Sequence, residues 1–354
     1  MPERTKSRKR EIAPRLQADS SQRPGIAVAL AGVGHAVGSE VVSNSELALS
    51  LGLESDWFLT RTGIVERRAC GPGEDVLTLG RDAVLGACED AGLRAGDLGA
   101  ETMLLHIQNG IAAFTPPAAI LLSRKLGFKT VRALGFDGVC AEPIAALEVA
   151  ALLLEARRCD RVILSAAVDF PEWVDPNDHD TSGLFGSGAG AIVLERSVGP
   201  DARASLRGVH WETHAGYSGL GQIPVLGYER HPERFSISVG YYEMDGRGLT
   251  RAALQVLPGV LEGVLDAAGW TREDADLVLA HQPNAKLLEI GMRHLGLDPA
   301  RVPMPVRHLG NMGPASLLVN LSLAKTDGRL APGTNLLLIA FGLGFSCGAA
   351  ALTL

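Results

Sequence analysis

The sequence is poor in cysteine and has no excess of positive charge. Five cysteines are scattered over 354 residues without any C-x-x-C pair. That spacing fits neither a zinc knuckle nor a disulfide framework, and it predicts a reducing, cytoplasmic compartment. The 40 acidic residues outnumber the 33 basic ones, which gives a net charge of −7. Such a balance argues against a nucleic-acid-binding protein, whose body is usually basic.

Long hydrophobic runs are missing too. The longest, residues 335–345, is about half of the ~20 residues needed to cross a bilayer, so we expect no membrane partner. The first 24 residues carry several basic side chains but lack the apolar stretch of a secretory signal. Their composition predicts a disordered basic tail over residues 1–24. An arm for an acidic partner or nucleic acid is the alternative interpretation.

The chain does contain enough apolar material, 46% of its residues, for a large buried core. Short apolar runs typical of buried strands alternate with longer helical patterns. The strand candidates are 26–32, 103–107, 162–168, 191–194, 277–280, 335–341 and 349–354, and the helix candidates are 77–91, 117–126, 143–157, 249–268, 285–295 and 315–325. This alternation predicts an α/β protein whose helices cover a mostly parallel sheet. Residues 200–248 have weak periodicity, and we interpret them as the join between two halves, 25–200 and 205–354.

Cys140 is the cysteine best placed for chemistry. It stands between a strand-like approach and a strongly apolar helical pattern, with Pro143 in the first turn. A thiol at a helix N-terminus lies at the positive end of the helix dipole, which favours its thiolate. On this segment alone, a nucleophile and a buried core residue are equally supported. For the other four cysteines a place in the core is the better interpretation.

Three further segments bear groups suited to chemistry. His281 directly follows a buried strand, at the carboxyl end where α/β sites gather. Asn311 lies between glycines before a helix, and residues 341–348 form a glycine loop whose amides can approach a ligand. Taken singly, each has an ordinary structural explanation. Taken with Cys140, they predict an acyl-transfer site in which the thiol holds an acyl group, amides bind its oxyanion, and His281 and Asn311 stabilise an enolate.

Several motifs, in this order, resemble those of β-ketoacyl-ACP synthase III and its relatives in the thiolase-fold superfamily. They are the opening strand and loop at 32–44, the W-x-x-x-R-T-G-I motif at 57–64, the nucleophile segment at 135–150, the glycine-rich segment at 185–194, H-Q-P-N at 281–284 and G-N-M-G-P-A-S at 310–316. The resemblance covers almost all of the chain after Gly25. It implies a thiolase-like five-layered αβαβα fold with two similar halves, and a homodimer. It also implies acyl-CoA and acyl carrier protein thioesters as substrates, with no permanently bound cofactor.

The resemblance further implies roles for single residues. Cys140, His281 and Asn311 would be catalytic, and the backbone amides of Cys140 and Leu343 would form the oxyanion hole. Trp57 and Arg61 would sandwich the adenine of coenzyme A, and Asn284 would contact pantetheine. Lys286 would meet the carrier protein. Phe114 and Thr115 stand where a partner subunit supplies a gate to the acyl pocket.

Two positions depart from the family pattern. Glu142 follows the nucleophile, where housekeeping members commonly have glycine; a carboxylate facing the thiol would raise its pKa, so we expect Glu142 to point elsewhere. Thr115 replaces an aromatic gate, which predicts a roomier or more polar acyl pocket, although Phe114 is adjacent. It also argues against head-to-head joining of two long acyl chains, which uses a Glu near this position. The departures favour specialised metabolism over the fatty-acid initiator.

The predicted function is decarboxylative Claisen condensation of an acyl-CoA primer with a malonyl-ACP-type extender, in polyketide or other specialised metabolism. The alternative is acyl transfer to a hydroxyl or amine, with His281 as general base; the retained Asn311 favours condensation. A non-catalytic partner subunit is least favoured, because all three catalytic residues are intact. No G-x-G-x-x-G with a suitably spaced acidic residue supports a dinucleotide site. The acidic loop 175–180 lacks the spacing of a calcium loop, so we expect no metal.

Overall fold

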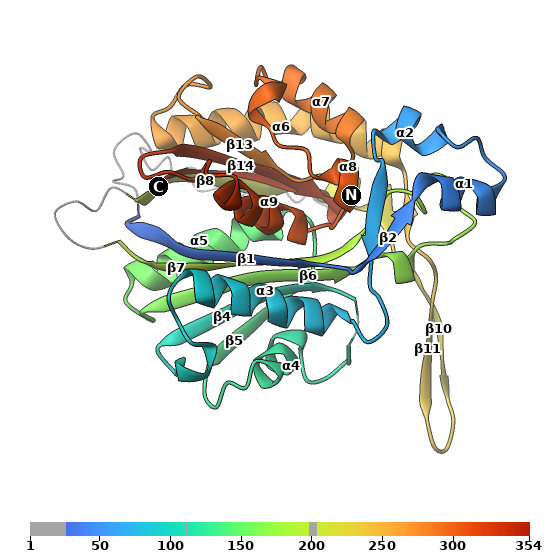
Figure 1. The fold of residues 1–354 in the computed structure, drawn as a ribbon, viewed down its shortest axis with the longest axis horizontal. Helices are drawn as coiled ribbons and strands as arrows, with labels where there is room; N and C mark the ends of the chain where they lie inside the picture. The colour runs from blue at the N-terminus through green and yellow to red at the C-terminus, as the bar shows by residue number, and fades with distance from the viewer. Residues whose placement is uncertain (1–25, 111, 198–203) are drawn as a thin grey trace, which may run out of the picture.

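The computed structural model describes residues 26–110, 112–197 and 204–354, and these form five stacked layers (Figure 1). Two sheets enclose a central layer of helices, and further helices cover the outer face of each sheet. The five-layered fold expected from the motifs is therefore confirmed. The predicted tail, residues 1–24, lies outside the described residues. Among the helices of the described part, none is long and apolar enough to cross a membrane.

The first sheet, below the centre of Figure 1, has the strand order β1-β7-β6-β4-β5. Strand β4 runs parallel to β5 and β6, whereas β7 runs antiparallel to β6 and β1. The strands are β1 (Val28–Val37), β4 (Thr102–Asn109), β5 (Arg132–Phe136), β6 (Arg161–Asp169) and β7 (Ser187–Arg196). The central strand β6 is buried along almost its whole length, as its unbroken apolar run predicts.

The second sheet repeats this arrangement in the order β8-β15-β14-β13. Here β13 is parallel to β14, and β15 is antiparallel to both of its neighbours. The strands are β8 (Ser205–Thr213), β13 (Leu277–Ala280), β14 (Asn335–Gly342) and β15 (Ser346–Thr353). The order matches β1-β7-β6-β4, without a counterpart of β5 among the described strands, which confirms two similar halves. The prediction of mostly parallel sheets holds for strand direction, since only β7 and β15 run against the other strands of their sheets. Each of these two strands lies between strands of the opposite direction, so the sheets are mixed.

The helices fill three layers. Between the sheets lie α5 (Glu142–Glu155) and α9 (Ala315–Thr326), and α9 is buried on all sides because its sequence is apolar all round. The outer layers hold α3 (Val76–Asp90) and α4 (Ala118–Lys125) on the first sheet, and α6 (Gly246–Ala268) and α7 (Ala285–His294) on the second. All six helices agree with the predicted ranges to within a turn.

The remaining elements lie mostly outside these layers. At the right of Figure 1 are β2 (Glu40–Ser43), α1 (Asn44–Leu51), α2 (Trp57–Thr62), β3 (Glu66–Ala69) and α8 (Val306–Leu309). Short 3-10 turns are η2 (Ala95–Asp97), η3 (Pro171–Trp173), η4 (Ala215–Leu220), η5 (Pro299–Arg301) and η6 (Leu343–Phe345). A hairpin that we call the arm, β10 (Val225–Arg230) and β11 (Phe235–Val239), projects from the body at the lower right of Figure 1. In the chain it is flanked by two short strands that pair with each other, β9 (Gly221–Gln222) and β12 (Glu243–Met244). The arm falls in the weakly patterned join, and no strand was predicted there.

Candidate active site

A cavity of about 640 Å³ lies between the halves and is lined by loops from both. Cys140 comes from the first half, and His281, Asn311 and Leu343 come from the second. The fold thus brings the four residues together around one space, although they lie in distant parts of the sequence. Arg61, Asn284 and Lys286 line the same cavity, whereas Trp57, Phe114 and Thr115 are not among its lining residues.

Cys140 lies in the turn that leads from β5 into α5, just before the helix begins at Glu142. Burial raises the pKa of the Cys140 thiol to about 12, and the charge of Glu142 acts in the same direction. The prediction that the helix N-terminus favours the thiolate is therefore wrong for the resting protein, because removal from water outweighs the helix dipole. Cys140 is a neutral thiol at physiological pH.

Glu142 holds the turn that carries the nucleophile. Its Oε2 accepts hydrogen bonds from the backbone N–H of Gly138 at 2.7 Å and of Val139 at 3.1 Å. Gly138 has a φ of 95°, and a Cβ there would lie 2.4 Å from the carbonyl oxygen of Gln108, so the turn requires glycine. The Glu142 carboxylate is thus engaged by backbone N–H groups, which is compatible with the expected orientation away from the thiol. Its charge still raises the pKa of Cys140.

His281 directly follows β13 and extends the parallel ladder, since its N–H donates to the carbonyl of Ile339 at 2.8 Å. Its ring packs edge-on against Phe341, with centroids 5.7 Å apart. Burial lowers the pKa of His281 to about 4. Its Nδ1 has no hydrogen-bond partner among the described residues. The imidazole is therefore neutral and retains hydrogen-bonding capacity for a ligand.

Asn311 is fixed by its backbone and by its side chain. Its N–H donates to the carbonyl of Leu184 at 2.8 Å, and its carbonyl accepts from Gly186 at 3.0 Å, which ties it to the entry of β7. The side-chain Oδ1 accepts the N–H of Gly313 at 2.9 Å. Because the oxygen is engaged, the Nδ2 group is the part of the amide available as a donor to a ligand.

The end of β14 packs directly on the nucleophile. A Cβ on Gly342 would lie 2.8 Å from the Cβ of Cys140 and 2.9 Å from its backbone nitrogen, so only glycine fits there. The next residue, Leu343, lines the cavity, and its side chain packs over Gly221 of β9. This close approach brings the loop that bears the Leu343 amide beside Cys140, which is the arrangement that an oxyanion hole of two backbone amides requires.

Arg61 and Trp57 contact each other at the cavity mouth. The guanidinium carbon of Arg61 lies 4.1 Å from the centre of the Trp57 ring, and the ring of His179 lies 5.3 Å from it. An adenine ring held between Trp57 and Arg61 therefore requires Arg61 to move off the indole. The adenine sandwich stays a prediction, and His179 is a neighbour that sequence reasoning missed.

Asn284 and Lys286 lie at the start of α7. The Oδ1 of Asn284 caps the helix by accepting the N–H of Leu287 at 2.8 Å, which leaves its Nδ2 for a ligand. Lys286 is exposed and forms no ion pair within the described part of the chain. Its ammonium group is thus available to an acidic partner, as the predicted carrier-protein contact requires.

Phe114 and Thr115 lie in an exposed segment before α4, and Phe114 is 73% exposed. The structure does not bring either side chain to the cavity of its own chain. Their role as a gate therefore depends on a second subunit and stays a prediction.

An aromatic cluster beside Cys140 was not predicted from the sequence, although Phe185 opens the glycine-rich motif at 185–194. The rings of Phe185 and Tyr242 lie 5.0 Å apart, and Phe170 stacks on Phe185 at 4.9 Å. Phe185 and Tyr242 line the cavity. Burial raises the pKa of Tyr242, and the nearby Cys140 adds to this effect. Tyr242 comes from the weakly patterned join, where no motif marks it, yet its ring helps to shape the space next to the nucleophile.

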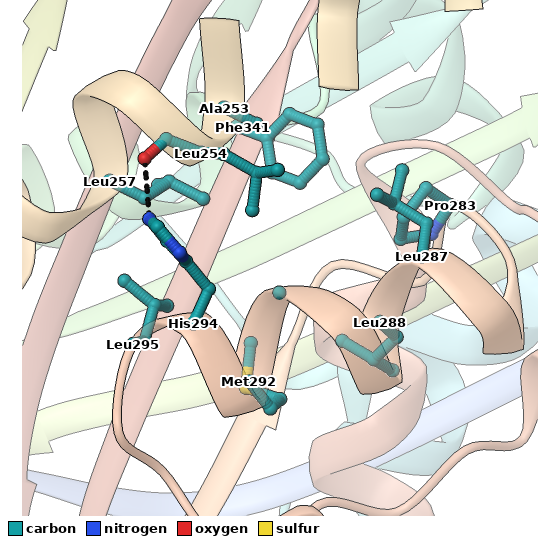
Figure 2. Close-up of a pocket in the computed structure, with 11 residues that line it drawn as sticks. Ala253, Leu254, Leu257, Pro283, Leu287, Leu288, Met292, His294, Leu295 and Phe341 are labelled. Atoms are coloured by element: carbon teal, nitrogen blue, oxygen red, sulfur yellow. Dashed lines mark hydrogen bonds between the residues drawn. The ribbon is translucent and has the colours of Figure 1, made fainter. Parts of the chain in front are cut away.

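A second, much smaller pocket lies between α6 and α7 (Figure 2). Its volume is about 20 Å³, and its walls are apolar except for His294, whose Nε2 is hydrogen-bonded to the carbonyl of Leu254 at 2.8 Å. Such a space holds about one water molecule. Phe341 lines both this gap and the large cavity. The gap is a packing defect behind the site.

Comparison with known proteins agrees with this geometry. Residues 136–215 match the family model of 3-oxoacyl-[acyl-carrier-protein (ACP)] synthase III, and residues 265–354 match the model of its C-terminal part. A β-ketoacyl-[acyl-carrier-protein] synthase III from Rhizorhabdus wittichii is 33% identical over 321 residues, which cover 91% of this chain and 97% of that protein.

Solved structures of such synthases superpose on almost the whole chain. The 3-oxoacyl-[acyl-carrier-protein] synthase III of Aquifex aeolicus superposes with a TM-score of 0.82 at 26% identity, covering 92% of this chain and all of that one. The priming β-ketosynthase of the R1128 polyketide pathway superposes with a TM-score of 0.80 at 25% identity, covering 92% and 96%. The fold and the cavity residues agree with these comparisons, and one relative is one-third identical over nine-tenths of this chain. The chain therefore belongs to the β-ketoacyl-ACP synthase III family of condensing acyltransferases.

Proposed function

We propose that this protein loads an acyl group from acyl-CoA onto Cys140 and condenses it with a malonyl group on acyl carrier protein, in polyketide or other specialised metabolism. The observation that carries the proposal is the convergence of Cys140, His281, Asn311 and Leu343 on one cavity. The likeness to a priming β-ketosynthase of a polyketide pathway supports the metabolic role. So do Glu142 and Thr115, where the sequence departs from the housekeeping pattern.

The first step is transfer of the acyl group between two thiols. The sulfur of Cys140 attacks the thioester carbonyl, the bond to the coenzyme A sulfur breaks, and the departing thiolate takes the proton that Cys140 gives up. The N–H groups of Cys140 and Leu343 stabilise the negative oxygen of the tetrahedral intermediate. Because burial keeps the Cys140 thiol neutral at rest, the proton transfer belongs to the reaction rather than to the free enzyme.

The second step forms the carbon–carbon bond. The malonyl carboxylate leaves as carbon dioxide, and the electron pair moves into an enolate whose oxygen accepts hydrogen bonds from His281 and from Nδ2 of Asn311. The enolate carbon then attacks the acyl carbonyl on Cys140, the carbon–sulfur bond breaks, and the released thiolate takes up a proton from solvent water. Both donors are neutral, and both lie in a buried site where hydrogen bonds to a developing charge are strong.

Acyl transfer to an alcohol or amine is the alternative, and the state of His281 disfavours it. That reaction needs His281 as a general base, but burial lowers its pKa to about 4, which makes it a weak base. Hydrogen-bond donation to an enolate requires only a neutral imidazole. The fixed amide of Asn311 has a role in condensation, where an enolate forms. It has none in acyl transfer to an alcohol or amine.

The test is the mass of the intact protein after incubation with acetyl-, hexanoyl-, longer acyl-, malonyl- and methylmalonyl-CoA, beside Cys140→Ala. We expect an acyl adduct on the native protein, absent in the variant, which malonyl carrier protein then removes as a β-ketoacyl product. Removal of the adduct only by alcohols or amines would establish acyl transfer instead. A folded protein that takes no acyl group from CoA or carrier protein would refute both and favour a non-catalytic subunit.

The adenine contact has its own test. Trp57→Ala should raise KM for an acyl-CoA more than KM for the same acyl group on its carrier protein, because only the first donor has an adenine. Equal effects on the two donors would refute the stacking role. Lys286→Ala is the opposite control, since it should weaken the carrier-bound donor more.

We also propose a homodimer, joined along β5. Within residues 26–110, 112–197 and 204–354 this strand pairs with β4 alone, and Leu134 on it is 46% exposed. Open edge strands with apolar side chains favour pairing with another chain. Light scattering should give a dimer for the native protein and a monomer for Leu134→Lys. The control, Leu49→Lys on the exposed face of α1, should remain dimeric. A monomeric native protein would refute the proposal.

A further inference from the structure

Four potential metal ligands meet on the outer face of the second sheet, away from the acyl site. His210 and Glu212 alternate along β8, so their side chains share the face that α6 covers, and His214 directly follows the end of this strand. Cys347 on β15 is the direct cross-strand partner of Glu212. Side chains opposite each other in an antiparallel pair lie on the same face. The strand register therefore gathers two imidazoles, a carboxylate and a thiol that are remote in sequence.

The ligand atoms are close enough to share an ion. One atom each from Glu212, His214 and Cys347 lie within 4.8 Å of one another. The Nε2 of His214 is 2.7 Å from Oε1 of Glu212, and the Nε2 of His210 is 3.9 Å from Oε2 of the same carboxylate. Cys347 is fully buried, and its sulfur lies 3.8 Å from the carbonyl oxygen of Glu212. Ligand atoms around a tetrahedral ion lie roughly 3.3–3.8 Å apart, given zinc bonds of about 2.0–2.3 Å.

From this geometry we propose that Glu212, His214 and Cys347 bind a Zn²⁺ ion, and that His210, which lies outside this group of three with its Nε2 3.9 Å from Oε2 of Glu212, turns inward as the fourth ligand. Mixed nitrogen, sulfur and carboxylate ligands suit zinc, and four protein ligands are typical of a structural rather than a catalytic site. Binding would release the thiol proton, whose pKa is raised to about 12 by burial and by Glu212 without the ion. The lack of a C-x-x-C pair hid this site from sequence reasoning, which predicted no metal.

The location suggests what the ion does. Cys347 follows η6, the loop that bears the Leu343 amide, after one intervening residue. On the other strand, the N–H of His214 donates to the carbonyl of Phe345 at 2.9 Å, and the two rings are 6.3 Å apart. An ion that joins Cys347 to His214 would therefore hold both sides of Phe345. Zn²⁺ would brace the loop that forms the oxyanion hole. The binding itself does not depend on the proposed reaction.

The test uses the metal-stripped full-length protein without a polyhistidine tag, in a Cys140→Ala background so that the cysteine that lines the acyl cavity is absent. Titration with Co²⁺ should give a thiolate-to-cobalt charge-transfer band with one ion per chain, which Zn²⁺ abolishes. Cys347→Ser should remove the band, and His214→Ala should weaken cobalt binding by more than ~100-fold, beyond the usual cost of an outer-shell partner. Cys159→Ser, a buried cysteine of the first half, is the matched control and should keep both the band and the affinity.

Hydrogen exchange tests the bracing. Zn²⁺ should slow amide exchange in residues 341–348 of the native protein and raise its Tm. In His214→Ala, Zn²⁺ should change neither the exchange nor the Tm. The absence of a charge-transfer band, or its survival in folded Cys347→Ser, would refute the site. His214→Ala, at a partly exposed position, keeps the test decisive even where Cys347→Ser does not fold. A band without any change in exchange would refute the bracing role.

Discussion

Two buried histidines occupy equivalent strands of the two halves, and their difference shows which one is free to act. His106 lies within β4 and His281 directly follows β13, the strand with the same place in the second sheet. Burial lowers the pKa of both to about 4. Both ring nitrogens of His106 are hydrogen-bonded, to Ser165 at 2.9 Å and to Gln108 at 3.3 Å. His281 keeps Nδ1 without a partner among the described residues and lines the cavity.

The comparison teaches that burial and pKa do not identify the functional histidine, whereas incomplete hydrogen bonding at a cavity does. A buried polar atom without a partner carries a desolvation penalty, and of the residues with such an atom in the described part of the chain His281 alone lines the cavity. The same contrast applies to the halves as a whole. The first half carries Cys140, the proposed nucleophile, and the second carries His281, Asn311 and Leu343, which line the same cavity.

The largest expected effect separates the two histidines directly. His281→Ala should lower kcat for condensation by about 10²–10⁴-fold, because a positioned donor to the enolate is lost. The free energy of unfolding of His281→Ala should change little compared with that of His106→Ala. His106→Ala should lower the free energy of unfolding by about 2–4 kcal/mol, since it leaves Ser165 and Gln108 unpaired around a cavity, with kcat nearly unchanged.

Turnover assays and urea unfolding of both variants check this. Similar loss of kcat in the two variants would show that His106 also acts on the reaction. Retained kcat in His281→Ala would remove the donor role from the proposed mechanism. The two readouts together prevent a merely unstable variant from being mistaken for an inactive one.

A fall in pH should reduce the stability contribution of the two histidines alike, although only His281 is proposed to act in the reaction. Both have a folded-state pKa near 4, below the ordinary value of 6.5. Their contribution to stability is therefore fully present above pH 6.5 and is lost as pH falls toward 4, because the unfolded chain takes up protons that the native chain refuses. Each histidine contributes about 3 kcal/mol over this range, from ~1.4 kcal/mol per pKa unit.

Urea unfolding between pH 7 and pH 4.5 measures this loss. His281→Gln and His106→Gln should each flatten the pH dependence by a similar amount, relative to their own stability at pH 7. A slope that persists unchanged in either variant would show that the histidine concerned is already protonated, or exposed, in the native protein.

The fold was largely predictable because burial leaves a periodic trace. The near-continuous apolar runs of β6, β13 and β14 and the apolar helix α9 were all recognisable from sequence. Strand β5 and the arm were not, since β5 is a partly exposed edge and the arm has exposed apolar side chains such as Tyr228. An element without a buried face has no strong pattern to read.

The site was predictable only where residues fall in motifs. Cys140, His281 and Asn311 lie in such segments, and the structure brings them to one cavity. Tyr242 and the metal cluster depend on which strands become neighbours, which no local pattern records. The thiol pKa of Cys140 was predicted in the wrong direction, because the helix N-terminus is visible in sequence whereas the depth of burial is not.

Tyr242 tests whether lining the cavity, rather than burial alone, determines the effect of a residue. It is partly buried, whereas His106 is fully buried, and it lines the same cavity as His281. Tyr242→Ala should open space beside Cys140 and shift the preference in kcat/KM toward longer acyl chains by roughly tenfold. Tyr228→Ala, at an exposed tyrosine of the arm, is the matched control and should leave the preference unchanged. An unaltered chain-length profile in Tyr242→Ala would place the acyl pocket elsewhere.

The smallest expected effect concerns charge rather than burial. Glu142 raises the pKa of Cys140 through its negative charge, whereas nothing comparable acts on His281. Glu142→Gln removes the charge but keeps an oxygen that can accept the N–H groups of Gly138 and Val139. The thiol pKa should therefore fall, and iodoacetamide should alkylate Cys140 faster at pH 8–9, by less than about tenfold, equivalent to ~1.4 kcal/mol.

The control for this change is Glu148→Gln on the same helix, whose carboxylate bonds instead to Nε1 of Trp211 at 2.7 Å. Alkylation of Cys140 in that variant should follow the native pH profile. If Glu142→Gln left the rate unchanged, the charge would be screened from the thiol, and burial alone would set the pKa of the nucleophile. If the rate fell, the hydrogen bonds from Gly138 and Val139 would need the full charge of a carboxylate, and Glu142 would act on Cys140 chiefly by holding its turn in place.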